Sequence, residues 1–203
     1  MKLCKKNNRV YGVGINDADY PTQPSVNGKS VMCSYYRTWS NMLQRCYSEK
    51  FQESRPTYKG CTVYPEWIYF MNFRKWMLTQ DWEGKALDKD LLIEGNKVYS
   101  ATTCVFVDQI TNNFTNDHGR ARGQYPIGVY LNKPKGKFIA YCHNPFTKRQ
   151  EHLGYFTCEH QAHLAWKARK HQLACQLADL QTDPRVAAAL RTRYSPETPQ
   201  QPL

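Results

Sequence analysis

The sequence lacks any apolar run that approaches the length of a membrane-spanning helix, and it contains no pair of cysteines separated by two residues. A helix that crosses a bilayer needs about 20 mostly apolar residues, so no transmembrane segment is predicted. Paired CxxC motifs are typical of zinc ribbons, and their absence argues against that class of site. Residues 1–12 carry lysines with no apolar stretch behind them, so we expect no secretory signal peptide and a cytoplasmic protein.

Eight cysteines are nevertheless present, at positions 4, 33, 46, 61, 104, 142, 158 and 175. In a reducing compartment they are expected to be free thiols. Small buried hydrophobic side chains are the favoured interpretation. A structural metal held by Cys33, Cys46, Cys61 and Cys104 is the alternative.

Acidic residues are scarce in one part of the chain. The formal net charge is +11, and residues 120–175 contain ten Lys or Arg against two acids, Glu151 and Glu159. Such focusing of positive charge favours a polyanionic partner. A basic helix on a membrane surface is disfavoured, because no strongly amphipathic Lys/Arg helix with a broad apolar face is evident.

Residues 125–168 are the most informative stretch. An alternating run that starts at Gly128-Val129 is followed by a Lys-Pro-Lys-Gly-Lys turn and a second run at 138–142. A second basic turn leads to a third run at 152–156, and Thr157 then opens a pattern with Ala162, Ala165 and Trp166 at helical spacing. We predict three short strands followed by a helix.

The strands and turns of this stretch carry basic and aromatic side chains, a combination that suits a nucleic-acid groove. The predicted contact residues are Tyr130, Lys133, Lys135, Lys137, Tyr141, Lys148 and Arg149. A small basic α+β module that binds protein is the alternative interpretation.

The same stretch resembles the APETALA2/ethylene-response-factor DNA-binding domain. The resemblance rests on Gly128-Val129, the strand at 136–140, the segment 153–156 and the helix that carries Glu159, Ala162 and Ala165. It implies a three-stranded sheet that enters the major groove of double-stranded DNA, with a helix packed behind it. Lysine and tyrosine dominate where that family usually has more arginine and tryptophan, and lysine lacks the bidentate fork of arginine.

The remaining patterns predict helices and short strands. Apolar residues at helical spacing predict helices at 34–47 and 65–77, with a strand at 62–64 between them. Residues 87–107 indicate a strand, a turn at Glu94-Gly95-Asn96 and a second strand, followed by a short helix at 108–114. A long helix is expected at 159–180, and Asp183-Pro184 opens a last helix before a disordered tail.

A strand–turn–strand–helix unit is the ββα scaffold of HNH nucleases, and residues 33–114 resemble HNH-like phage proteins. The resemblance rests on the segments 39–46, 66–73, 87–90 and 99–106. Phage homing-type nucleases join such a half to an APETALA2-type module in the same order. The resemblance therefore implies a phage-type DNA-binding protein that acts in the host-cell cytoplasm.

The candidate catalytic strand departs from active HNH enzymes, which usually carry Asp-His there. In this chain the pair is Asp88-Lys89, and a lysine that is protonated near neutral pH accepts no proton. Lys89 could pair with a phosphate instead, or act as base if burial lowered its pKa. The candidate catalytic residues are Asp88, Lys89 and Asn96, and His118 is the other candidate base.

Mg²⁺ is the metal that such a site implies, bound through oxygen ligands. The candidate ligands are Asp88, Asp90 and Asn112, with Asn113 as the alternative from the helix and Asn96 from the turn. The structural alternative is that the two aspartates fix the hairpin and that Asn96 forms its turn beside Gly95.

Three functions are compatible with these patterns. The first is a phage-type DNA-binding protein with an HNH-like fold and little or no nuclease activity. The presence of Lys89 where active enzymes have histidine favours this first function. The second is an active metal-dependent endonuclease of the homing type. The third is an interaction protein whose basic face binds an acidic host protein or a host defence nucleoprotein complex.

We predict an α+β fold with four segments. Residues 1–115 form an HNH-like ββα domain with a helical N-terminal part, and 116–124 form a linker. Residues 125–182 form an APETALA2-like domain, a three-stranded antiparallel sheet packed on a helix. Residues 183–203 form a C-terminal helix and the disordered tail.

Overall fold

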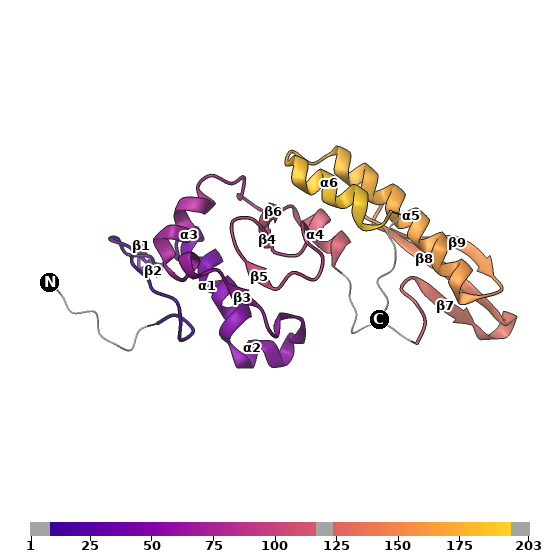
Figure 1. The fold of residues 1–203 in the computed structure, drawn as a ribbon, viewed down its shortest axis with the longest axis horizontal. Coiled ribbons are helices and arrows are strands. Elements are labelled where there is room, and N and C mark those ends of the chain that lie inside the picture. The colour runs from indigo at the N-terminus through magenta and orange to yellow at the C-terminus, as the bar shows by residue number, and fades with distance from the viewer. Residues whose placement is uncertain (1–8, 117–123, 196–203) are drawn as a thin grey trace. The chain divides into compact units, whose positions relative to one another are not determined.

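The computed structural model describes residues 9–116 and 124–195, and the chain separates into two compact units, 1–108 and 109–203 (Figure 1). Helices and small sheets occur in both units, so the fold is α+β, as the sequence predicted. No helix in either described range is long and apolar enough to cross a membrane.

Short elements build the first unit. Its α-helices are α1 (Ser34–Tyr47), α2 (Glu49–Ser54) and α3 (Phe70–Met77), and its 3-10 helices are η1 (Pro56–Tyr58) and η2 (Pro65–Ile68). Its strands are β1 (Ser25–Val26), β2 (Lys29–Ser30), β3 (Thr62–Val63), β4 (Ala86–Asp88), β5 (Val98–Tyr99) and β6 (Val105–Val107). Helix α1 spans the residues that the apolar spacing predicted.

The core of the first unit forms between α1 and α3. The buried residues of α1 recur at intervals of three and four, which places them on one side of the helix; they are Trp39, Met42, Leu43 and Cys46. Helix α3 contributes Phe70, Phe73 and Met77 to the same cluster. The indole N–H of Trp39 donates to the Trp67 carbonyl at 2.7 Å, so this buried donor is satisfied.

The predicted single helix at 65–77 is wrong, because the segment is divided at Tyr69. Tyr69 has φ −88° and ψ 125°, an extended conformation between η2 and α3. The backbone around it pairs with Ile15, whose N–H donates to the Ile68 carbonyl at 2.8 Å and whose carbonyl accepts from Phe70 at 3.0 Å. These bonds to a distant segment compete with the helical ones, which apolar spacing alone does not reveal.

The predicted hairpin between residues 87 and 107 also pairs differently. Strand β4 pairs antiparallel with β6, whereas β5 pairs parallel with β3. The Thr62 N–H donates to the Lys97 carbonyl at 2.8 Å, and the Tyr64 N–H donates to the Tyr99 carbonyl at 2.9 Å. The turn around Asn96 therefore leads from one small sheet to another and does not close a two-stranded hairpin.

The second unit contains the three-stranded sheet. Its elements are α4 (Gln109–Thr115), β7 (Val129–Asn132), η4 (Lys133–Lys135), β8 (Lys137–Asn144), β9 (Arg149–Phe156), α5 (Glu159–Asp179) and α6 (Pro184–Arg193). The strands form an antiparallel sheet in the order β7-β8-β9, and α5 lies along one face of it (Figure 1). The Asp183 carboxylate caps α6 by accepting from the Arg185 N–H at 2.8 Å, as its sequence signal indicated.

Helix α4 groups with the second unit, although the predicted first domain extended to residue 115. The Lys170 ammonium of α5 donates to the Phe114 carbonyl at 2.7 Å and lies 3.4 Å from the centre of the Phe114 ring. The Gln181 amide donates to the Thr111 hydroxyl at 3.2 Å. These contacts hold α4 against the helical layer of the second unit.

Candidate nucleic-acid interface

The sheet has an inner face against α5 and an outer face turned away from it. Val129 and Ala140 are paired across β7 and β8 and are buried with Ala162 of α5, which defines the inner face. Because side chains alternate along a strand, Tyr130 and its partner Ile139 belong to the outer face. Tyr155 pairs with Ile139 from the other side and joins them there.

A β-bulge brings His152 to the same outer face as Tyr155. Residues three apart on a regular strand point to opposite faces. The register shifts between Ala140 and Tyr141, so that Gly154 pairs with Ala140 while His152 pairs with Tyr141. The extra residue in β9 shifts the alternation of side chains by one position, so that His152 lies on the same face as Tyr155. Gly154 has φ +129°, a backbone conformation that glycine adopts readily.

The outer face therefore carries a continuous row of rings, which we call the aromatic row: Tyr130, Tyr141, His152 and Tyr155. Successive ring centres lie 5.9, 5.4 and 5.1 Å apart along the row. Tyr130 is 57% exposed and Tyr155 is 43% exposed. The row is thus an accessible aromatic surface that is held in place by ring–ring contacts.

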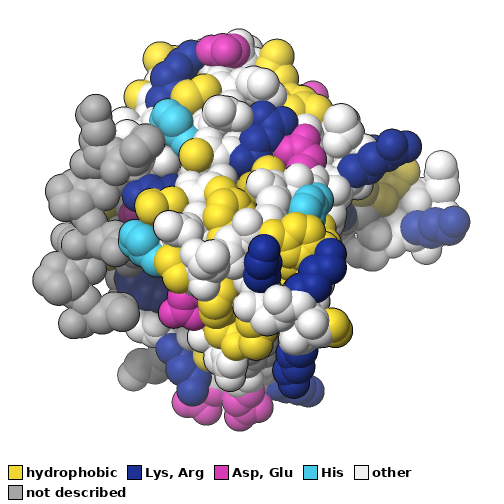
Figure 2. Space-filling model, turned by 90° about the vertical axis from the view of Figure 1, so that its right-hand side faces the viewer, with side chains coloured by type: hydrophobic (Ala, Val, Ile, Leu, Met, Phe, Trp, Pro, Cys, Tyr) yellow, Lys and Arg dark blue, Asp and Glu magenta, His cyan; other side chains and the backbone are white. Residues whose placement is uncertain are grey.

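Two basic turns flank the aromatic row at opposite ends of β8. Lys133, Lys135 and Lys137 follow β7, and the turn is fixed by the Asn132 side chain, which accepts from the Lys135 N–H at 3.1 Å. The Lys135 ammonium lies 4.4 Å from the centre of the Tyr155 ring. Lys148 and Arg149 form the other turn, and all five cations are exposed. Figure 2 views the structure from the side on which β7, β8 and β9 are drawn in Figure 1. Lys and Arg side chains lie beside hydrophobic ones in this view.

A salt bridge ties the sheet to α5 on the inner side. The Arg169 guanidinium donates to the two oxygens of the Glu151 carboxylate at 2.7 and 3.1 Å, and the Asn144 amide donates to the same carboxylate at 2.7 Å. These donors, Arg169 first, lower the pKa of Glu151 to about 2. Asn144 also accepts from the Phe146 N–H, so the network fixes the β8–β9 turn that carries Lys148.

We expect this bridge to give the second unit an acid-sensitive contribution to stability. The folded pKa of Glu151 is depressed, so the contribution is present above the unfolded pKa near 4.5 and is lost as pH falls from there towards 2. The unfolding free energy of wild type should therefore approach that of Glu151→Gln as pH is lowered across this range, in urea titrations. A constant difference between the two proteins at all pH values would contradict this role.

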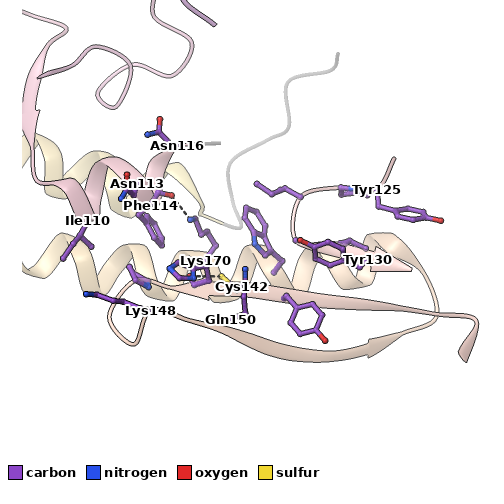
Figure 3. A pocket seen from close by; sticks show the side chains of 18 residues that line it. Ile110, Asn113, Phe114, Asn116, Tyr125, Tyr130, Cys142, Lys148, Gln150 and Lys170 are labelled. Atoms are coloured by element: carbon purple, nitrogen blue, oxygen red, sulfur yellow. Dashed lines mark hydrogen bonds between the residues drawn. The ribbon is translucent and has the colours of Figure 1, made fainter. Parts of the chain in front are cut away.

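A pocket of about 850 Å³ opens beside the aromatic row (Figure 3). The ladder between β7 and β8 ends at Val129–Ala140, followed by one bond from the Tyr141 N–H to the Gly128 carbonyl at 2.9 Å. Beyond that point no strand of the described residues pairs with β8 on this side. The pocket lies along this part of β8, between α4, the segment 125–130 and α5. Its lining includes Phe114, Tyr125, Tyr130, Tyr141, Lys148 and Gln150.

The candidate catalytic residues Asp88, Lys89 and Asn96 do come together in the first unit. One Asp88 carboxylate oxygen accepts from the Asp90 and Leu91 N–H groups at 2.9 and 2.7 Å. The Lys89 side chain is buried, and its ammonium donates to the Asn96 carbonyl at 2.8 Å and to the Asp90 carboxylate at 3.1 Å. The Asn96 amide donates to the Lys89 and Val98 carbonyls at 2.6 and 2.8 Å. The contacts of all three residues close the loop between β4 and β5.

This donor set does not fit a divalent cation. Asp88 is engaged by backbone N–H groups and Asp90 by an ammonium, which would repel a metal ion. Burial, followed by the neighbouring Asp90 carboxylate, raises the pKa of Asp88. Asn112 lies on α4 in the second unit, and the candidate base His118 lies outside the described residues. In the described ranges no three His, Cys, Asp or Glu side chains are grouped to hold a metal.

The buried thiols of the first unit have the character of hydrophobic side chains. Cys46, Cys61 and Cys104 belong to its core cluster, whereas Cys33 is partly exposed. Burial raises the pKa of Cys46 and of Cys104 to about 12. Among the described residues these thiols form no group of three potential metal ligands, so the structure favours their role as buried apolar side chains.

Comparison of the chain with protein-family models, with curated proteins and with solved structures found no match.

Three features of the second unit were not predicted from the sequence: the Glu151–Arg169 bridge, the β9 bulge and the buried Lys170. Burial lowers the pKa of Lys170 to about 8. Glu151 is one of two acids in a strongly basic window, and this isolation is a signal that it has a specific partner. Gly154 inside an alternating run is the usual mark of a bulge. The sequence does not indicate that Lys170 is buried, because it lies in a helix beside other basic residues.

Proposed function

We propose that the protein binds DNA through the outer face of the β7-β8-β9 sheet, as a phage-type DNA-binding protein with little or no nuclease activity. The observation that carries the proposal is the aromatic row between two turns that present five exposed cations. Lysine ammonium groups on flexible stems pair with phosphates irrespective of sequence. Double-stranded DNA, the partner that the family resemblance implies, is the ligand to test first.

A gel-shift titration with random-sequence duplex DNA, with and without Mg²⁺, tests this proposal. We expect a shift at low salt that is independent of Mg²⁺, because the cations on the sheet supply the charge that neutralises phosphates. Pull-down of a specific protein partner that survives nuclease treatment, together with no gel shift, would favour the interaction-protein alternative instead.

We expect the purified protein to show no metal-dependent cleavage of plasmid DNA. Lys89 is bonded within the loop that Asp88 and Asn96 close, and general acid–base catalysis is typically worth about 100- to 10,000-fold in rate. The measurement is the conversion of supercoiled plasmid to nicked circles with Mg²⁺ or Mn²⁺. Asp88→Asn is the control variant, because its amide oxygen still accepts the two backbone N–H groups. Nicking by wild type that is lost in this variant would overturn the assignment.

A further inference from the structure

The chemistry of the aromatic row differs from that of a surface that reads paired bases. Bidentate contacts from Arg, Asn and Gln identify base pairs in the major groove. The row consists of three tyrosines and one histidine, which lack those paired donor and acceptor groups. Exposed rings on a sheet instead suit stacking against bases, and this requires a base whose face is open.

The pocket is a second, independent indication of unpaired bases. Tyr130 and Tyr141 belong both to the aromatic row and to the pocket lining, so the two features are continuous. Its volume of about 850 Å³ lies within the ~300–1,000 Å³ range of small-ligand sites, and Phe114 and Tyr125 add apolar walls. A base within a duplex stack has no access to such a pocket, whereas a base outside the stack can enter it.

Polar groups at the pocket suit a nucleotide. The Lys148 and Gln150 side chains line it and lie at the sheet side in Figure 3. An ammonium can pair with a phosphate, and an amide offers both a donor and acceptors to a base edge. At the other end of the row, the Lys135 ammonium donates to the Tyr155 hydroxyl at 3.3 Å, so a cation lies beside that ring as well.

From the row and the pocket together we infer that this face binds single-stranded nucleic acid in preference to duplex. Unpaired bases stack on Tyr130 and Tyr155, one base enters the pocket, and the lysines of the two turns hold the phosphates. This inference rests on the proposed function and narrows its substrate class. Duplex DNA then binds through the phosphate contacts alone, without the contribution from stacking.

Fluorescence anisotropy of the full chain with a labelled single strand and with its matched duplex tests the inference. We expect the single strand to bind at least about tenfold more tightly than the duplex at equal salt, because the stacking of even one base on an aromatic ring contributes on this scale. The double variant Tyr130→Leu/Tyr155→Leu should lose this preference and retain duplex binding. An RNA strand of the same sequence shows whether this face distinguishes ribose from deoxyribose.

Tyr64→Leu/Tyr69→Leu is the matched control, because these tyrosines of the first unit are 49% and 44% exposed, close to the values of the tested pair. The control should bind both ligands like wild type. Quenching of a 2-aminopurine base in the strand should accompany binding by wild type and disappear in the Tyr130/Tyr155 variant. Equal or tighter binding of duplex, or an unchanged strand affinity in that variant, would overturn the inference. Binding of neither ligand would instead reject the proposed function.

Discussion

Replacement of Lys133, Lys135 and Lys137 by alanine is expected to weaken duplex binding by roughly 500-fold at about 0.1 M salt. At this salt concentration, each phosphate contact that is lost lowers the logarithm of the binding constant by about 0.9. The plot of log binding constant against log salt should lose about 3 units of slope. The three lysines are exposed, and Asn132 and Gly136 fix the backbone of their turn, so we expect the triple variant to keep the fold.

A matched variant separates this local effect from a change in net charge. Lys50, Lys59 and Lys75 are exposed lysines of the first unit, and their replacement by alanine removes the same total charge. We expect this control to bind nearly as well as wild type in anisotropy titrations. Equal losses in the two triple variants would mean that charge alone, and not the sheet, determines binding.

The second large effect is expected at Trp166, which is 8% exposed. Its ring stacks on His163 with centres 5.4 Å apart, and a Cβ at Gly128 would overlap it. The His163 ring in turn contacts the Ile127 carbonyl at 3.1 Å, so the indole fixes the segment that enters β7. Trp166→Ala should lower the free energy of unfolding by roughly 3–5 kcal/mol through the cavity that it leaves.

Leu164→Ala is the control for this change, because Leu164 lies on the same helix and is 49% exposed. Its free energy of unfolding should change by less than about 1 kcal/mol, since little apolar surface is buried there. Urea unfolding followed by far-ultraviolet circular dichroism compares the two variants. Similar midpoints for Trp166→Ala and wild type would show that the indole is not part of the core.

Local patterns in the sequence predicted the second unit well. The alternating runs and the Lys-Pro-Lys-Gly-Lys turn gave the strands and turns of the sheet, and helical spacing gave α5. Such elements are determined by neighbouring residues, and the antiparallel partners are joined by short turns. The predicted contacts Tyr130, Lys135 and Tyr141 consequently lie on or beside one face of the sheet.

Features that depend on distant partners were not predictable in the same way. Tyr69 is extended because Ile15 pairs with the backbone beside it, and β5 pairs with β3 across more than thirty intervening positions of the chain. The burial of Lys89 depends on the loop that returns through Asn96. The pocket arises because β7 is shorter than β8. This difference in length depends on how the two strands pair, which only the three-dimensional fold reveals.

The dependence of DNA affinity on salt measures how many phosphates the sheet contacts. Five exposed cations lie on the two turns of the sheet, and each phosphate contact with duplex DNA contributes a slope of about −0.9, so the wild-type plot of log binding constant against log salt should be linear with a slope of roughly −4 to −5. A slope near zero, or no measurable binding at low salt, would contradict DNA binding by the cations of this sheet.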